Sequence, residues 1–275
     1  MSKQLPKNGE RVLPDRVESI VEHLSYLRHL FAYEHASQFV NTQTRLLDVG
    51  CGEGYGVSQL SKTCNAACGV DVSDHAIMFA RSKYQCKNLK FRTYDGITIP
   101  YKDNAFNLVV SFQVIEHVKE VNRYLQEIKR VLRSDGMAII TTPCRLYRLK
   151  PGQKPWNPYH IIEYDPKGFL QVLESVFADV EVKGIRAADE VQAIEYERVK
   201  KGLSRKDPYN LRRFIPTTIR SILRRSYRRI RSKGNEEMQL TKSYTQFSTS
   251  DFYIIEDGLE QSIDLLGTCR NSSKE

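Results

Sequence analysis

The stretch LLDVGCGEGYG, residues 46–56, places four glycines at alternate positions directly after a short apolar run. A short apolar run bounded by glycine is typical of a buried strand. Glycine costs roughly 0.5–1 kcal/mol relative to alanine inside regular structure, so the cluster indicates a tight turn where bare backbone approaches a ligand. The stretch therefore predicts a strand that ends at a ligand-binding turn.

Short segments of strand length recur on both sides of this turn and alternate with helical patterns. The expected strands are residues 45–51, 66–72, 89–95, 106–112, 136–142, 180–185 and 262–269. The expected helices between them are residues 55–61, 74–84, 120–132 and 166–177. Near-continuously apolar strands that alternate with helices favour a parallel sheet covered on both faces. The predicted fold class is therefore a doubly wound α/β sheet.

Changes of pattern along the chain predict four segments. Residues 1–44 are expected to form a helical leader with Asp15 as its N-cap, and residues 45–185 the core. Residues 186–250 are expected to form a basic helical insertion, and residues 251–275 to return to the core and complete the sheet. The leader and the insertion together would then form a lid over the site.

The positive charge of the chain is concentrated in one segment. The 275 residues have a formal net charge of +9, and nine Lys or Arg with no Asp or Glu lie between Leu211 and Lys233. From Arg220 to Arg231 the arginines fall on one side of a helical projection and the apolar residues on the other. This basic amphipathic helix suits a packed helix with a solvated face, or contact with an anionic membrane surface or acidic substrate. Nucleic acid is the least favoured partner, because no RNA-binding module accompanies the arginines.

The expected location is cytoplasmic, and the membrane alternative for that helix would add peripheral attachment at the inner membrane face. No stretch approaches the roughly 20 apolar residues that span a bilayer, and the first residues lack the apolar region of a secretory signal. The six cysteines form no CxxC pair, so neither a disulfide framework nor a zinc clip is expected.

Three aspartates lie in or after successive expected strands, where a parallel sheet binds its ligands. Asp71 is placed to accept hydrogen bonds from the hydroxyls of a ribose. Asp95 is placed to accept one from an exocyclic amine, and Asp48, inside a strand, needs a compensating group such as an ammonium. The turn does not fit the dinucleotide spacing G-x-G-x-x-G. Ribose, adenine and ammonium together describe S-adenosylmethionine as the cofactor.

Four segments in this order resemble the class I S-adenosylmethionine-dependent methyltransferases of the broad type 11 group. They are LLDVGCGEGYG, GVDVS, YDGITIPYKDNAFNLVVSFQVIEHV and VLRSDGMAIITTP. The resemblance implies a Rossmann-like sheet of seven strands with the last strand antiparallel. The cofactor contacts that it implies are Asp48, Gly50, Gly52, Asp71, Val72, Asp95, Gly96 and Gln113.

A weaker resemblance involves GERVLPDR and HLFAYEHA in the leader. These segments are similar to the leader of a methyltransferase subgroup associated with sugars of surface glycans. The likeness departs at Ala32, where that subgroup commonly has an arginine. It implies O-methylation of a small sugar or glycan-like acceptor. The alternatives are a quinone, lipid or RNA acceptor, or a binding module without catalysis.

Two histidines are candidates for activating an acceptor hydroxyl, which must lose its proton during attack. His117 follows the fourth expected strand, next to the expected position of the methyl group. His160 and Glu163 follow the fifth expected strand, in a loop whose aromatic and polar residues suit a ring-bearing acceptor. The run from Asn157 to Glu163 resembles one that lies over the active site in related O-methyltransferases. No metal is expected, because Glu116, Glu163 and the histidines lack a decisive ligand spacing.

Overall fold

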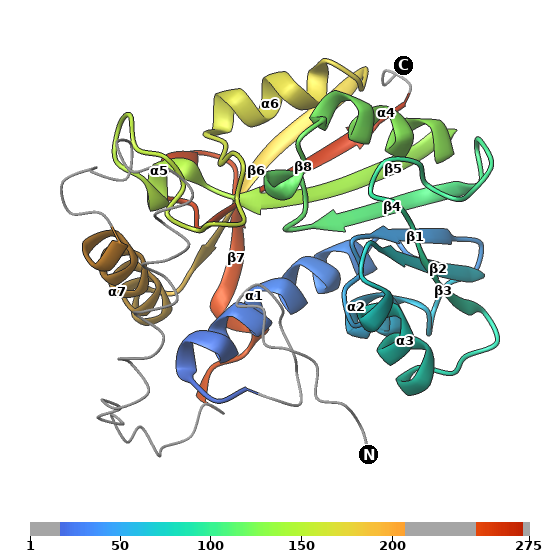
Figure 1. Ribbon diagram of the computed structural model, residues 1–275, viewed down its shortest axis with the longest axis horizontal. Coiled ribbons are helices and arrows are strands. Elements are labelled where there is room, and N and C mark those ends of the chain that lie inside the picture. The colour runs from blue at the N-terminus through green and yellow to red at the C-terminus, as the bar shows by residue number, and fades with distance from the viewer. Residues whose placement is uncertain (1–16, 207–245, 272–275) are drawn as a thin grey trace, which may run out of the picture.

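A mixed sheet forms the centre of the computed structural model, which describes residues 17–206 and 246–271 (Figure 1). In these residues the sheet has eight strands in the order β3-β2-β1-β4-β5-β8-β6-β7. The strands are β1 Arg45–Val49, β2 Ala66–Asp71, β3 Leu89–Thr93, β4 Phe106–Phe112, β5 Leu132–Pro143, β6 Asp179–Ala187, β7 Phe252–Ile255 and β8 Asp264–Arg270. The predicted fold class is confirmed, and the sheet has one strand more than the expected seven.

Helices cover both faces of the sheet (Figure 1). They are α1 Ile20–Ser37, α2 Tyr55–Leu60, α3 Asp74–Lys83, α4 Val121–Val131, α5 Arg145–Arg148, α6 Pro166–Glu174 and α7 Asp189–Lys206, with the 3-10 turns η2 Ile115–His117, η5 Thr249–Asp251 and η6 Leu259–Gln261. Leu24 of α1, Val57 of α2 and Ile77 of α3 belong to one buried cluster. Leu125 of α4 and Phe169 of α6 belong to the cluster on the other face. Apolar side chains on both faces explain why these strands are apolar throughout.

The strand order reverses beside β1, and this reversal sets the place of the site. Asp48 of β1 pairs in parallel with Gly69 of β2 on one side and with Val110 of β4 on the other. The chain moves outward from β1 to β2 and β3, then returns to place β4 on the opposite side of β1. In open sheets ligands bind beyond the carboxyl ends of the strands at such a reversal. The glycine turn after Val49 begins there.

The last strands of the sheet are antiparallel to their neighbours. β8 lies between β5 and β6 and is antiparallel to both. The additional strand β7 pairs antiparallel with β6, from Gly184↔Ile255 to Ala187↔Phe252. Its residues are aromatic or β-branched, as strands favour, but the run is only four residues long and was not among the expected strands.

Two predicted features of the leader and insertion differ from the structure or lie outside it. α1 begins at Ile20, and the Ser19 hydroxyl caps it by accepting a hydrogen bond from the Glu22 amide at 3.2 Å. The expected cap, Asp15, lies outside the described residues, as does the basic stretch from Arg220 to Arg231. Of the helices that the structure describes, none is both long and apolar enough to cross a membrane.

Candidate functional site

The glycine turn joins β1 to α2 with backbone that other residues adopt only under strain. Gly50 and Gly52 have φ of 83° and 52°, in the left-handed region. The amides of Gly50 and Cys51 both donate to the Val70 carbonyl, at 2.8 and 3.0 Å. A Cβ at Gly50 would collide with Val114, whereas a Cβ at Gly52 would meet no atom within 4 Å. The turn therefore packs against the end of β4 at Gly50 and is open at Gly52, where a ligand can lie.

Asp48 is a fully buried carboxylate beneath this turn. The Tyr33 hydroxyl of α1 donates to its Oδ2 at 2.8 Å, and its Oδ1 is buried with no hydrogen-bond partner among the described residues. Burial raises the pKa of Asp48 to about 7, although the hydrogen bond from Tyr33 lowers it. An unpartnered buried carboxylate oxygen is costly, and a cationic donor would offset that cost. Asp48 thus fits the ammonium group expected from the sequence.

The raised pKa of Asp48 makes the stability of the unliganded protein depend on pH. The ordinary value is 3.8 and the folded value about 7, so its stabilising contribution is complete below pH 3.8 and is lost as the pH rises through 7. We expect Asp48→Asn to raise the melting temperature relative to wild type more at pH 8 than at pH 5. Glu116 has a similarly raised pKa but is present in both proteins. Thermal unfolding at the two pH values tests this, and an equal difference at both would contradict it.

Asp71, at the end of β2, connects the glycine turn to the next loop. Its Oδ2 accepts from the Gly52 amide at 3.0 Å and its Oδ1 from the Ser73 amide at 2.8 Å. Each carboxylate oxygen can accept a second bond, so Asp71 keeps capacity for the ribose hydroxyls expected from the sequence. The next residue, Val72, is 62% exposed. An apolar side chain exposed beside the turn suits one face of an aromatic base.

Asp95 and Gly96 lie beyond β3, next to Val72. Asp95 Oδ1 accepts from the amides of Ile97 and Thr98, at 2.8 and 2.7 Å, and these bonds lower the pKa of Asp95. Gly96 has φ of 80°, and a Cβ there would lie 3.1 Å from Val72 Cγ1. The structure therefore brings the ends of β2 and β3 together as predicted, with an ionised carboxylate beside an apolar surface.

Gln113 follows β4 in a conformation that non-glycine residues rarely adopt. Its φ is 58°, its amide donates to the Thr141 carbonyl at 3.0 Å, and its Nε2 donates to Thr141 Oγ1 at 3.4 Å. Positive φ in a glutamine costs of order 1–3 kcal/mol and is concentrated at functional sites. Gln113 is followed by Val114, which contacts the glycine turn, and then by η2. The predicted cofactor residue Gln113 and the predicted catalytic residue His117 therefore lie in one short stretch of the chain.

The two predicted catalytic histidines lie together although 43 positions separate them in the chain. The rings of His117, in η2, and His160, in the loop after β5, have centroids 4.9 Å apart and an angle of 81° between their planes. His117 Nδ1 lies 3.0 Å from the Tyr159 carbonyl, and His160 Nδ1 lies 2.7 Å from Glu163 Oε1. The structure therefore brings His117, His160 and Glu163 into one group.

Glu116 is a member of this group that the sequence did not identify as catalytic. It is 1% exposed, and the Thr142 hydroxyl donates to its Oε2 at 3.2 Å. Burial raises the pKa of Glu116 to about 7. Its carbonyl accepts from the amides of Ile161 and Ile162, at 2.8 and 3.3 Å, and so ties the loop after β5 to η2. The only sequence signal that Glu116 belongs to this group is its position beside His117.

Buried ion pairs hold Glu163 and the neighbouring elements in place. Arg148 Nε lies 3.2 Å from Glu163 Oε2. Burial raises the pKa of Glu163, but His160 and Arg148 more than reverse this, so the pKa lies below its ordinary value. The Arg148 guanidinium also stacks 4.7 Å from the centre of the Trp156 ring. An ionised Glu163 is therefore fixed as the partner of His160.

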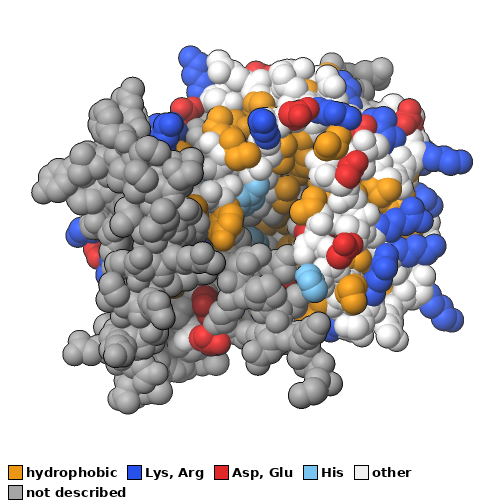
Figure 2. Space-filling view, viewed as in Figure 1, with side chains coloured by type: hydrophobic (Ala, Val, Ile, Leu, Met, Phe, Trp, Pro, Cys, Tyr) orange, Lys and Arg blue, Asp and Glu red, His pale blue; other side chains and the backbone are white. Residues whose placement is uncertain are grey.

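One face of the molecule has a hollow at its middle (Figure 2). Hydrophobic side chains gather at the middle of the face shown in Figure 2, around a hollow in which histidine is visible. The exposed hydrophobic residues that follow β5 include Leu146 in α5 and, in the loop after it, Tyr159, Ile161 and Ile162. Such apolar surface around a few polar groups is typical of small-molecule sites.

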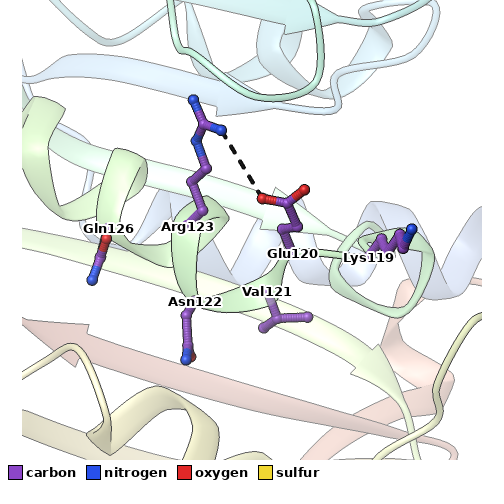
Figure 3. A pocket seen from close by; sticks show the side chains of 6 residues that line it. All are labelled: Lys119, Glu120, Val121, Asn122, Arg123 and Gln126. Atoms are coloured by element: carbon purple, nitrogen blue, oxygen red, sulfur yellow. Dashed lines mark ion pairs between the residues drawn. The ribbon is translucent and has the colours of Figure 1, made fainter.

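A second hollow of about 650 Å³ lies at the first turn of α4. It is lined by Lys119, Glu120, Val121, Asn122, Arg123 and Gln126 (Figure 3). Glu120 and Arg123 form an ion pair of 4.0 Å, with side chains 67% and 55% exposed. Exposed pairs of this kind contribute little, and the lining includes none of the predicted cofactor or catalytic residues. This hollow is not a candidate active site.

Comparison with known proteins places the glycine turn inside a known domain family. Residues 47–140 match the methyltransferase domain family model. A probable S-adenosylmethionine-dependent methyltransferase of Mycobacterium tuberculosis, MT3114, is 31% identical over 183 residues, which cover 66% of this chain and 64% of the relative. The matched part thus spans just under two thirds of that relative. A fatty-acid O-methyltransferase of Mycolicibacterium smegmatis is 32% identical over 99 residues, covering 35% of this chain and 36% of the relative.

The fold is also that of a solved structure, the YcgJ protein of Bacillus subtilis. The TM-score is 0.52 at 15% identity, covering 90% of this chain and all of that chain. Residues 47–140 therefore resemble a methyltransferase domain, and the chain is similar to relatives named as S-adenosylmethionine-dependent methyltransferases. The site fits that cofactor, because it offers an unpartnered buried oxygen of Asp48, open backbone at Gly52 and the exposed face of Val72.

Proposed function

We propose that the chain transfers a methyl group from S-adenosylmethionine to a hydroxyl oxygen of a small sugar or glycan-like acceptor. When bound, the cofactor supplies a methyl group on a sulfonium, which is already an activated leaving group. The chain must then align the acceptor and help to remove its proton. Asp48, the glycine turn and Asp71 would hold the cofactor, and the group formed by His117, His160 and Glu163 would activate the hydroxyl.

The observation that carries this proposal is the orientation of His160. Glu163, which is ionised and fixed by Arg148, accepts from His160 Nδ1 at 2.7 Å. This bond places the proton on Nδ1 and leaves a lone pair on Nε2, as a group that activates a hydroxyl requires. The group is directly linked through Gln113 and Val114 to the glycine turn. Tyr159, which is 47% exposed in the same loop, offers a ring on which a sugar can stack.

His160→Asn is expected to lower the rate of methyl transfer by about 100-fold or more, the usual contribution of a group that assists proton transfer. Its affinity for S-adenosylhomocysteine should stay within about threefold of wild type, because His160 is not among the predicted cofactor residues. The measurement is transfer of a labelled methyl group to a panel of nucleotide sugars and lipid-linked glycans, with calorimetry for binding. His75→Asn, an exposed histidine on α3, is the matched control. Unchanged transfer by His160→Asn would reject the assignment.

An acceptor with an apolar chain is the second candidate. Leu146, Ile161 and Ile162 are 50%, 55% and 40% exposed, and the backbones of the two isoleucines are tied to Glu116 beside the histidines. A sugar needs fewer exposed aliphatic side chains than this. The fatty-acid O-methyltransferase relative also favours such an acceptor. Adding hydroxylated and carboxylated long-chain lipids to the panel separates the candidates, since methylation confined to them would reject the sugar.

A further inference from the structure

Glu116, His117 and His160 bring one carboxylate and two imidazoles to a single point. One ligand atom from each of the three lies within 4.8 Å of the other two. Glu116 and His117 come from η2 after β4, and His160 comes from the loop after β5. Two imidazoles and a carboxylate form the protein ligand set of several catalytic zinc sites, in which a further position is left for water or substrate.

The second nitrogen of each imidazole is held in the way that metal-binding histidines are held. His117 Nδ1 lies 3.0 Å from the Tyr159 carbonyl, an oxygen that can only accept. His160 Nδ1 lies 2.7 Å from Glu163, whose carboxylate is paired with Arg148. Both contacts select the tautomer with its proton on Nδ1 and its lone pair on Nε2. A carboxylate or backbone carbonyl at the outer nitrogen is the recurrent second layer of metal sites.

Glu116 supplies the negative charge that such a site needs. Its side chain is buried, and the Thr142 hydroxyl donates to its Oε2 at 3.2 Å. Its backbone carbonyl accepts from Ile161 and Ile162, and so holds η2 against the loop that carries His160. An ionised carboxylate buried in this way is costly, and a cation beside it would offset that cost.

We propose that Glu116, His117 and His160 bind one divalent transition-metal ion of the Zn²⁺ class, with an open position for the acceptor hydroxyl. Two nitrogen ligands favour such an ion over Mg²⁺ or Ca²⁺, which prefer oxygen. In a tetrahedral site with bonds near 2.1 Å, ligand atoms lie about 3.4 Å apart, so binding draws the three side chains closer. With the ion bound, the Nε2 lone pair of His160 would be a metal ligand and not the proton acceptor, so His160 would activate the hydroxyl through the ion. The ion would lower the pKa of the hydroxyl, whose proton passes to water. This role, though not the binding itself, rests on the proposed function.

The test measures metal binding directly, with no methyl transfer involved. Full-length protein is stripped with a chelator and titrated with Co²⁺, followed by visible absorption, and with Zn²⁺, followed by calorimetry. We expect one ion per chain, and at least about tenfold weaker binding in each of Glu116→Gln, His117→Asn and His160→Asn. Glu163→Gln, which changes a positioning residue, should weaken binding about 10- to 100-fold. Binding of S-adenosylhomocysteine by each variant confirms that it is folded.

Adventitious binding is controlled by removing exposed ligands elsewhere. The double variant His75→Asn with Cys86→Ser lacks an exposed histidine and an exposed thiol, and should bind Co²⁺ as wild type does. Absence of stoichiometric binding by wild type, or binding that Glu116→Gln leaves unchanged, would overturn the metal site. Undiminished methyl transfer by chelator-treated protein would overturn the role of the ion in transfer, and would leave the proposed function intact. Conversely, metal binding without transfer to any acceptor would reject the proposed function alone.

Discussion

Asp71→Ala is expected to weaken the binding of S-adenosylhomocysteine by about 100-fold or more. The carboxylate accepts from the amides of Gly52 and Ser73, at 3.0 and 2.8 Å, and so holds the glycine turn in its binding conformation. Hydrogen bonds to a charged group contribute about 1.5–3 kcal/mol each, and the predicted bonds to the ribose are lost as well. Loss of about 3 kcal/mol alone corresponds to a factor of more than 100. Isothermal titration calorimetry measures the effect.

Two further variants serve as comparisons for Asp71→Ala. Asp135→Ala removes an exposed aspartate that pairs with Arg133 on the surface, and should leave the affinity unchanged. Asp95→Ala should weaken binding less than Asp71→Ala, because Asp95 is exposed and holds only its own loop. An affinity within threefold of wild type in Asp71→Ala would show that the turn does not receive the adenosyl group there.

The arrangement of the predicted cofactor residues could be anticipated because its signals are local. Each acid follows or lies within an apolar strand, and Gly50, Gly52 and Gly54 have positive φ where the backbone turns. Asp71 and Gly52 are 19 residues apart, but parallel pairing of β1 with β2 brings their strand ends together without further information. The fold class follows from the same alternation of strands and helices, since a parallel sheet has few ways to connect its strands.

The catalytic side was predictable only in part, because its residues meet through tertiary packing. His117 and His160 were identified separately, but their ring contact depends on where the loop after β5 folds back over η2. Glu116 looked like a neighbour of His117, and only the structure shows it buried against Thr142. Tyr33 belongs to the leader, and its bond to Asp48 depends on how α1 packs on the turn.

The position of α1 on the sheet depends on a buried arginine, Arg28, whose ion-pair partners lie far away in the sequence. Arg28 is 6% exposed, with Nε 3.0 Å from Asp264 Oδ2 of β8 and Nη1 3.6 Å from Glu195 Oε2 of α7. Burial of Arg28 could have been suspected from the sequence, because Arg28 falls on the same side of the helix as the apolar residues Leu24 and Leu27. Its partners could not be inferred, since neither β8 nor α7 is near α1 in the chain.

Arg28→Met is expected to lower the free energy of unfolding by about 3–5 kcal/mol, the usual cost of removing one partner from a buried ion pair. Methionine fills similar space, so the loss comes from two carboxylates left without their shared cation. Burial raises the pKa of Asp264 even though Arg28 lowers it, and removal of Arg28 raises it further. The extra loss of unfolding free energy in Arg28→Met is absent below 3.8, the ordinary pKa of an aspartate. It grows as the pH rises through the pKa of Asp264 in the folded protein. Urea unfolding at pH 5 and pH 8 should therefore show the larger loss at pH 8.

A second change tests whether charge, rather than packing, causes this loss. Arg28→Met combined with Asp264→Asn should recover part of the stability at pH 8, because one of the stranded charges is gone. Glu195 keeps Arg198 at 2.6 Å and is therefore less affected. Arg133→Met, which removes a half-exposed arginine, should change the unfolding free energy by no more than about 0.5 kcal/mol. A loss in Arg28→Met that is independent of pH and unrelieved by Asp264→Asn would contradict this account, because the loss would then not come from the carboxylates that Arg28 neutralises.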